Sequence, residues 1–155
     1  PNSGRRQRQM CIRDRLLAET GQTTPAGSSI INISSVMGKV GYIDTSAYNT
    51  SKGAVTLMSK AVGVEFATKR TPIRVNSLHP GFVQTPLLDT GMNRMVAEGL
   101  AEKPEDLKGM IAQATPMGRI ADTSEIASGA WFLASDDSGY MTGAELVIDG
   151  GWTAQ

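Results

Sequence analysis

Residues 28–69 read SSIINISSVMGKVGYIDTSAYNTSKGAVTLMSKAVGVEFATK and combine a short apolar run, a glycine-containing loop and a long apolar-rich segment. The run at 29–33 is β-branched and nearly continuous in apolar character, which is typical of a buried strand of a parallel sheet. Gly38 and Gly41 indicate an irregular loop over 34–45. From 46 to 69, apolar residues at helical spacing are mixed with small ones, so we expect a helix that is buried over much of its surface.

The segments on either side extend this pattern. Residues 73–78 alternate in polarity and predict a second strand, and 144–148 predict a third. The polar, Met-rich stretch 85–118 predicts one or two short helices, and an N-cap signature at 122–125 begins another helix. Residues 16–20 resemble the last turn of a helix. Strands that alternate with long crossovers form a parallel sheet with right-handed connections, so the predicted fold class is α/β.

Composition excludes several classes of protein. Hydrophobic residues make up 40% of the 155-residue chain and charged residues 19%, which argues against wholesale disorder. No apolar run reaches the roughly 18 residues of a membrane span. The single cysteine, Cys11, excludes an intramolecular disulfide framework, and the single histidine, His79, excludes a multi-histidine metal centre. With no signal peptide in the sequence, we expect a cytoplasmic protein with no membrane partner.

The zero net charge is an average of two unequal parts. Residues 1–15 carry five arginines and one acid, which leaves ten basic and fourteen acidic residues in 16–155. A flexible nucleic-acid-binding arm is one interpretation of the basic segment, and a disordered or artefactual terminus is the other. We favour the second, and expect no nucleic-acid partner, because the acidic remainder offers no basic surface to continue such an arm.

Tyr48 and Lys52 are the first residues that suggest chemistry. They are four residues apart at the start of the predicted helix, so both project from one face. A nearby ammonium favours the phenolate form of a tyrosine, and such a pair can act as a general acid or base on an alcohol or ketone. Taken alone, the spacing favours a solvated helix face or a tyrosine at the edge of the core over a catalytic pair.

Polar groups also follow two strands at the same sheet edge. Ser34 and Ser35 come directly after the first strand, where open α/β sheets place their ligands, although a serine there can simply cap a loop. The second strand ends in the turn Pro80-Gly81, after which exposed amides can hold a carboxamide or phosphate group. An ordinary strand-terminating turn would look the same. A site is favoured only because these two segments and the Tyr48–Lys52 pair are expected to converge at one edge of the sheet.

Together these motifs resemble the short-chain dehydrogenase/reductase family, and more closely its bacterial secondary-alcohol dehydrogenases. The resemblance covers about 28–155 and rests on Ser35, on Tyr48 thirteen residues later, on Lys52, and on the turns at 76–81 and 149–151. It implies that Tyr48 is the catalytic acid or base and that Ser35, rather than its neighbour Ser34, polarises the substrate oxygen. Lys52 would hold the nicotinamide ribose and favour the ionised form of Tyr48.

The same resemblance implies an NAD or NADP cofactor held by Tyr48, Lys52 and the segment after the second strand. That segment would contribute the Pro80-Gly81 turn, the Val83 backbone and the Thr85 hydroxyl, whereas His79 would be a structural turn residue. Residues 85–118 would form a substrate lid over a small apolar alcohol or ketone.

The resemblance also implies a homotetramer that uses the helix at 125–134 and the strand at 145–149. In some relatives a C-terminal residue binds structural magnesium, which makes Gln155 a candidate metal ligand, although a packed or frayed terminus is the alternative.

The chain departs from the family pattern in its first part. No T-G-x-x-x-G-x-G fingerprint occurs in the sequence, so the pyrophosphate cradle and the residue that separates NAD from NADP are both absent from it. We therefore expect a doubly wound Rossmann-like sheet reduced to the family's strands 5, 6 and 7, with 29–33 as an uncovered edge. On this basis 16–155 is the C-terminal part of the domain. It is either the catalytic half of a secondary-alcohol dehydrogenase or an inactive fragment that retains only folding and oligomerisation.

Overall fold

Three parallel strands form the centre of the molecule. The computed structural model describes residues 14–155, in which β1 (Ser28–Ile33), β2 (Ile73–Pro80) and β3 (Glu145–Ile148) pair in the order β1-β2-β3. Ile33 pairs with Leu78 in β2, and Leu78 pairs in turn with Leu146 in β3. The predicted parallel α/β sheet, with β1 at one edge, is confirmed for these residues. The expectations for Cys11 and for the arginine-rich segment, apart from Asp14 and Arg15, fall outside them.

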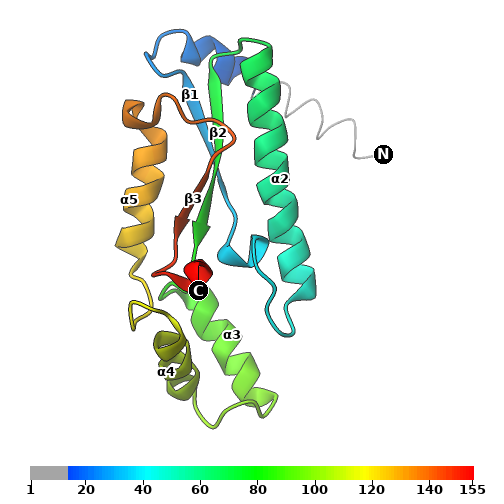
Figure 1. Ribbon diagram of the computed structural model, residues 1–155, viewed down its shortest axis with the longest axis vertical. Coiled ribbons are helices and arrows are strands. Elements are labelled where there is room, and N and C mark those ends of the chain that lie inside the picture. Colours follow the sequence, from blue (N-terminus) through cyan, green and yellow to red (C-terminus); the bar gives the residue numbers. More distant parts are fainter. Residues whose placement is uncertain (1–13) are drawn as a thin grey trace.

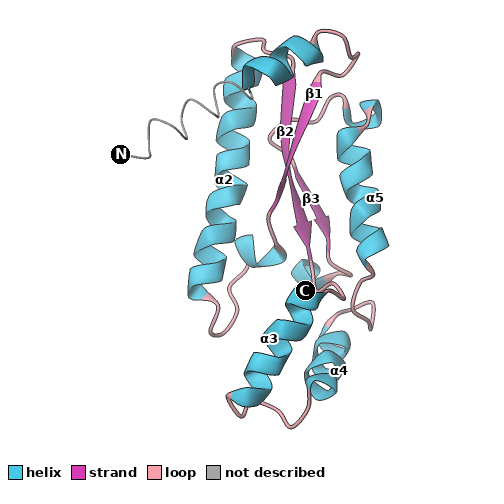
Figure 2. Ribbon diagram, turned by 180° about the vertical axis from the view of Figure 1, so that it is seen from behind, coloured by secondary structure: helices cyan, strands magenta, loops and turns pink. Residues whose placement is uncertain are grey.

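Helices cover both faces of the sheet, as Figures 1 and 2 show. The long helix α2 (Ser46–Thr68) lies on one side and α5 (Thr123–Ala134) on the other. The helices α3 (Pro86–Ala97) and α4 (Pro104–Ala114) lie beyond the carboxyl ends of the strands, which confirms two short helices in the Met-rich stretch. Short 3-10 turns, η1 (Val36–Gly38), η2 (Asp136–Ser138) and η3 (Trp152–Ala154), complete the order of elements, and a helix over 14–21 precedes β1.

The core is small and centred on β2. Leu78 and Leu133 are fully buried and Val75 is 1% exposed. On the α5 side the backbones pack closely, because a Cβ on Gly129 would lie 2.3 Å from Ile148 Cδ1. The polar positions of β2 are buried as well, including Arg74, Asn76, Ser77 and His79. The alternating sequence of 73–78 therefore predicts the strand, but it does not predict that both faces are buried. The polar side chains can be buried because each has internal hydrogen-bond partners.

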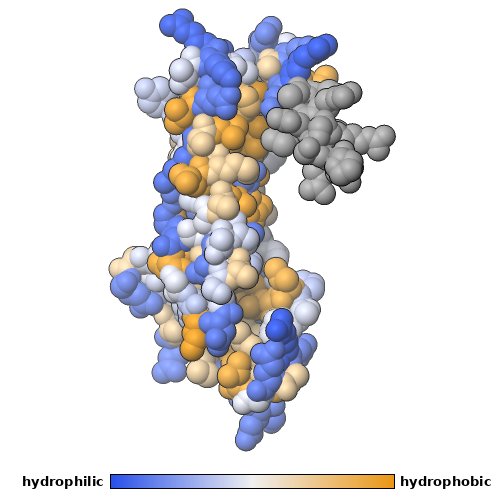
Figure 3. All heavy atoms as spheres, turned by 90° about the vertical axis from the view of Figure 1, so that its right-hand side faces the viewer, coloured by the Kyte–Doolittle hydropathy of each residue, from blue (hydrophilic) through white to orange (hydrophobic). Residues whose placement is uncertain are grey.

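The prediction that the long helix is buried over much of its surface is wrong for the described chain. Only Thr56, Ser59 and Gly63 of α2 are buried, whereas Leu57 is 69% and Val64 61% exposed. A single sheet face and η1 cover one narrow stripe of this helix, so Leu57, Met58 and Val64 are left exposed to solvent. Figure 3 shows apolar side chains gathered on this side of the molecule.

The predicted start of α5 is confirmed. Glu125 Oε2 accepts a hydrogen bond of 2.8 Å from the backbone N–H of Asp122, as in a capping box. Arg119 also pairs with Glu125 at 2.6 Å, and its hydrogen bonds are the main reason that the pKa of Glu125 is lowered to about 2. The negative charge is thus kept at the N-terminus of the helix, where the helix dipole favours it.

None of the helices in 14–155 combines the length and the apolar character that crossing a bilayer would require.

Candidate active site

The two serines after β1 have different environments. Ser34 is 2% exposed, and its hydroxyl lies 2.9 Å from both the Lys52 carbonyl oxygen and Thr56 Oγ1, so it ties the loop to α2. The Ser35 Oγ accepts a hydrogen bond of 3.2 Å from the Met37 backbone N–H and caps η1. Because that bond uses the oxygen as an acceptor, the Ser35 proton remains available for donation. This difference favours Ser35 over Ser34 as the group that meets a substrate.

Close packing fixes η1 against the first turns of α2. A Cβ added to Gly38 would lie 2.8 Å from Ser34 Oγ and 2.9 Å from the carbonyl carbon and oxygen of Lys52. Only glycine allows this approach without displacing backbone. The sequence interpretation of 34–45 as wholly irregular is corrected here, since its first residues form this short 3-10 turn.

Tyr48 and Lys52 lie on one face of α2, as the spacing predicts. Lys52 Nζ is 5.6 Å from the centre of the Tyr48 ring and donates a hydrogen bond of 3.0 Å to the carbonyl oxygen of Ile33. The bond fixes the ammonium at the end of β1, next to Ser34 and Ser35. Tyr48 is 42% exposed, so its ring is accessible from solvent. The structure therefore brings the end of β1 and the Tyr48–Lys52 pair together.

The segment after β2 presents backbone groups at the same edge of the sheet. Gly81 donates its N–H to Ile148 at 2.9 Å. Further on, the backbone on both sides of Val83 pairs with Ala121. The Phe82 carbonyl accepts from the Ala121 N–H, and the Gln84 N–H donates to the Ala121 carbonyl, each at 2.9 Å. The Val83 N–H and carbonyl must then point the opposite way. Thr85 Oγ1 bonds to that carbonyl at 3.3 Å and caps α3.

An aromatic cluster, which the sequence analysis did not identify, lies where these segments meet. Phe82 and Trp152 pack edge-on with ring centres 4.8 Å apart, and Tyr42 lies 6.1 Å from Trp152 and 6.4 Å from Phe82. The three rings connect the loop after η1, the segment after β2 and the C-terminal turn. No spacing signal in the sequence links them, because they are 40 or more positions apart.

A polar cluster behind Ser35 was also missed. The sequence predicts that His79 is a structural turn residue, and this is wrong as to the turn. His79 lies within β2 and is fully buried. Its ring nitrogens lie 3.0 Å from the Ser35 carbonyl oxygen and 2.8 Å from Ser77 Oγ. Glu145, at the start of β3, is paired with Lys39 and Lys60 and lies 4.0 Å from His79 Nε2.

Stability at low pH should depend on Glu145. Hydrogen bonds from Lys39 and then from Lys60 lower its pKa to about 2 from an ordinary 4.5. A folded-state pKa below the unfolded value stabilises the fold above the unfolded pKa, and this contribution is lost as pH falls toward 2. We expect Glu145→Gln to remove about 1–2 kcal/mol at pH 7, after allowing for screening of the partly exposed lysines, and to flatten the loss of stability between pH 5 and 2.

Urea unfolding at a series of pH values measures this effect. The matched control is Glu65→Gln, which removes an exposed i,i+4 partner of Lys69. Parallel pH curves for wild type and Glu145→Gln would show that the ion pairs of Glu145 with Lys39 and Lys60 do not contribute.

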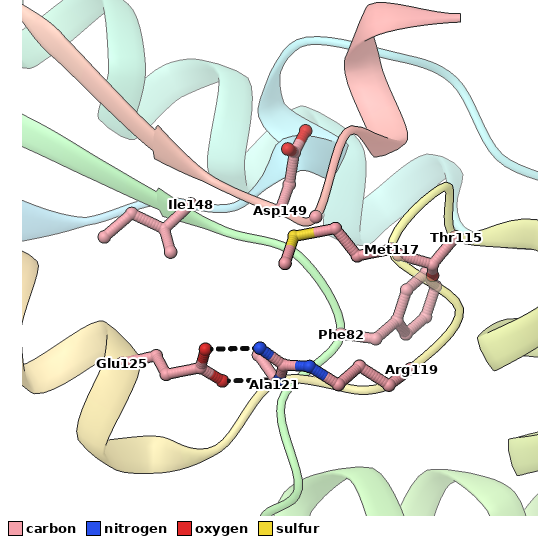
Figure 4. A pocket seen from close by; sticks show the side chains of 9 residues that line it. Phe82, Thr115, Met117, Arg119, Ala121, Glu125, Ile148 and Asp149 are labelled. Atoms are coloured by element: carbon pink, nitrogen blue, oxygen red, sulfur yellow. Dashed lines mark hydrogen bonds and ion pairs between the residues drawn. The ribbon is translucent and has the colours of Figure 1, made fainter.

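The cavity in Figure 4 is separate from the Tyr48–Lys52 pair. It has a volume of about 60 Å³ and lies on the α5 side of the sheet, between Phe82, Met117 and the Arg119–Glu125 pair. None of Ser35, Tyr48 and Lys52 lines it. We therefore do not assign the substrate to this space.

The proposed magnesium ligand has another partner. Gln155 Nε2 donates to the carbonyl oxygen of Ala114 at 3.1 Å, and within 14–155 no group of three or more His, Cys, Asp or Glu side chains could hold a metal ion. Asp149 accepts hydrogen bonds from Gly151 and Thr153 in the C-terminal turn. Burial alone would raise its pKa, but hydrogen bonds from Thr153 and Gly151 outweigh it and lower the pKa. Nothing in 14–155 supports the expected magnesium site.

Known proteins match most of the chain. A family model described as enoyl-(acyl carrier protein) reductase matches residues 15–153. The chain is 47% identical over 131 residues to the NADP-dependent (R)-specific alcohol dehydrogenase of Lentilactobacillus kefiri, covering 83% of this chain and 47% of that protein. It is 38% identical over 125 residues to the cyclopentanol dehydrogenase of Comamonas sp., covering 81% of this chain and 45% of that protein.

A solved structure supports the same relationship. The fold resembles that of a short chain dehydrogenase family protein from Francisella tularensis, with a TM-score of 0.77 and 34% identity over 84% of this chain and 52% of that one. The chain spans about half the length of the curated relatives that it matches.

Proposed function

The chain belongs to the short-chain dehydrogenase/reductase family, and on that premise we propose that it carries the catalytic half of an NAD(P)-dependent secondary-alcohol dehydrogenase or ketone reductase. The observation that carries this proposal is the placement of Lys52 between the end of β1 and the ring of Tyr48, 5.6 Å away. The 47% identity to an alcohol dehydrogenase over the same residues supports it.

Three side chains divide the work on the substrate oxygen. In the direction of reduction, Tyr48 gives its phenolic proton to the oxygen that becomes the alcohol, and in oxidation it takes the proton back. The Ser35 hydroxyl donates a hydrogen bond to the same oxygen and stabilises the negative charge that develops there. The Lys52 ammonium stabilises the phenolate that is left on Tyr48 after proton transfer.

The hydrogen-bond donors of Lys52, Val83 and Thr85 suit one half of a nicotinamide cofactor. When bound, the cofactor supplies or accepts the hydride. Lys52 keeps further N–H donors beside its bond to Ile33 and would hold ribose hydroxyls, while the Val83 N–H and the Thr85 hydroxyl would hold the carboxamide. The Pro80-Gly81 turn would pack on the ring. The Lentilactobacillus relative is named as NADP-dependent, but the residue that separates NAD from NADP is absent from this sequence, so the chain itself favours neither cofactor.

The substrate we propose is a small apolar secondary alcohol or its ketone. The relatives' names refer to alcohols, one of them cyclopentanol. The aromatic cluster of Tyr42, Phe82 and Trp152 would supply an apolar wall, and α3 and α4 would cover it as a lid. In this lid Met92 is 2% exposed and serves packing, whereas Met110 is 64% exposed and free to adapt.

A second candidate is a non-catalytic module that retains only the family's self-association. The exposed apolar residues of α2 and α5 favour it, among them Leu57 at 69% and Trp131 at 76% exposure. A homo-oligomer, a tetramer by analogy with the family, fits both candidates.

Complementation of the chain tests the proposal. We would join residues 16–155 to the N-terminal half of the Lentilactobacillus dehydrogenase and measure NADPH oxidation with cyclopentanone. We expect clear turnover from the joined protein and little from the 155-residue chain alone, because the chain has no Gly-rich pyrophosphate fingerprint. A joined protein that folds, associates and binds NADPH but reduces no ketone would favour the non-catalytic module.

A further inference from the structure

The end of β1 is held in place by two consecutive residues of β2. The Ser34 N–H donates to the Leu78 carbonyl at 2.8 Å, and the Ser35 carbonyl oxygen lies 3.0 Å from His79 Nδ1. That oxygen also accepts from the Gly38 N–H at 3.0 Å, which closes η1. Apart from this local turn, His79 is the group that fixes the Ser35 carbonyl from outside its own loop.

The hydrogen bonds define which His79 nitrogen carries the proton. A carbonyl oxygen can only accept, so Nδ1 must donate to Ser35. In a neutral ring Nε2 is then an acceptor, and it takes the Ser77 hydroxyl proton at 2.8 Å in preference to the more distant Ala144 carbonyl at 3.4 Å. The contacts are thus complete for a neutral ring with its proton on Nδ1.

The charged groups around the ring are consistent with the neutral form. Glu145 faces it from β3, Lys39 from the end of η1 and Lys60 from α2. Burial lowers the pKa of His79 most strongly and the two lysines lower it further, against the opposing effects of the bond to Ser35 and of Glu145.

We propose that His79 is a positioning residue for the reaction, which holds the Ser35 carbonyl through a neutral Nδ1–H tautomer and so sets the place of the Ser35 hydroxyl. The proposal rests on the function proposed above. Ser35 has to meet an oxygen on which charge develops, and a displacement of about 1 Å at such a group can cost about 100-fold in rate. Ser77 and Glu145 act one step further away, by setting the protonation of the ring.

The single histidine makes the tautomer directly observable. We would label histidine with ¹⁵N in the 155-residue chain and record long-range ¹H–¹⁵N spectra from pH 5 to 8. We expect one set of ring signals, from a neutral Nδ1–H ring that stays unprotonated through pH 6.5. An Nε2–H tautomer, or a ring that is protonated at pH 6.5, would overturn the assignment.

Variants separate positioning from mere packing. In the ketone-reduction assay, His79→Leu should lower kcat about 10- to 100-fold with little change in KM, and His79→Asn, whose amide can replace the Nδ1–H donor, should restore most of it. In a Ser35→Ala background the His79→Leu change should have almost no further effect. Additive losses of kcat in the double variant would overturn the proposal. If His79→Leu does not fold, the kcat of His79→Asn and the histidine spectra decide whether His79 positions Ser35. An inactive wild type with the expected tautomer would instead refute the proposed function.

Discussion

Replacing Tyr48 with phenylalanine is expected to lower ketone reduction by about 10²- to 10⁴-fold, the range typical of a lost general acid. Only the phenolic hydroxyl is removed, and the ring remains 5.6 Å from the Lys52 ammonium. Without a phenolic proton, the oxygen that gains negative charge during reduction must be protonated by water. The loss should therefore fall mainly on kcat, while NADPH binding, to which Lys52, Val83 and Thr85 contribute as well as Tyr48, should fall far less.

The measurement is steady-state NADPH oxidation by the joined protein described above, together with NADPH binding by fluorescence. Tyr140→Phe is the matched control, because Tyr140 is fully exposed and far along the chain, and its hydroxyl should not affect the rate. Equal rates for wild type and Tyr48→Phe would exclude Tyr48 as the proton donor.

Much of the local structure follows from sequence pattern. The apolar run at 29–33 specifies β1, the Tyr48–Lys52 spacing places both residues on one face of α2, and the N-cap signature correctly begins α5. These features depend on neighbours within a few residues, so periodicity and capping rules contain them.

The missed features depend on contacts between distant segments. His79 and Glu145 are 66 positions apart, and a histidine next to Pro80-Gly81 resembles a turn residue until the strand register brings it beside Ser35 and Ser77. The exposed side of α2 was also mispredicted. Apolar spacing indicates that a helix face is suited to burial, but it does not show whether this chain contains the element that packs against it. Tertiary partners of polar residues have no local sequence signal.

Arg74 is the strongest example of such a hidden role, and its loss should have the largest effect on stability. The side chain is 6% exposed and has no carboxylate partner within hydrogen-bond distance. Nε donates to the Ala26 carbonyl at 3.0 Å, Nη1 to the Leu133 and Ser138 carbonyls at 3.2 and 3.1 Å, and Nη2 to the Ser135 carbonyl at 3.1 Å. One guanidinium thus joins the loop before β1 to the end of α5 and to η2.

We expect Arg74→Met to lower the free energy of unfolding by about 3–5 kcal/mol, because methionine fills much of the space but leaves several buried carbonyl oxygens without a donor. Arg74→Lys should lower the free energy of unfolding less, because an ammonium keeps the charge and part of the hydrogen bonding. It should still be destabilising, because its three donors are on a single atom and cannot reach all the carbonyls at once. Urea unfolding of the 155-residue chain measures both.

Arg94→Met is the control for loss of a positive charge. Arg94 forms an exposed i,i+4 pair with Glu98 at 2.8 Å, so this change should have little effect on the free energy of unfolding. If Arg74→Met were no worse than Arg94→Met, the carbonyls around Arg74 would have to be satisfied by water. The junction of β1, β2 and α5 would then be open to solvent rather than closed by the guanidinium.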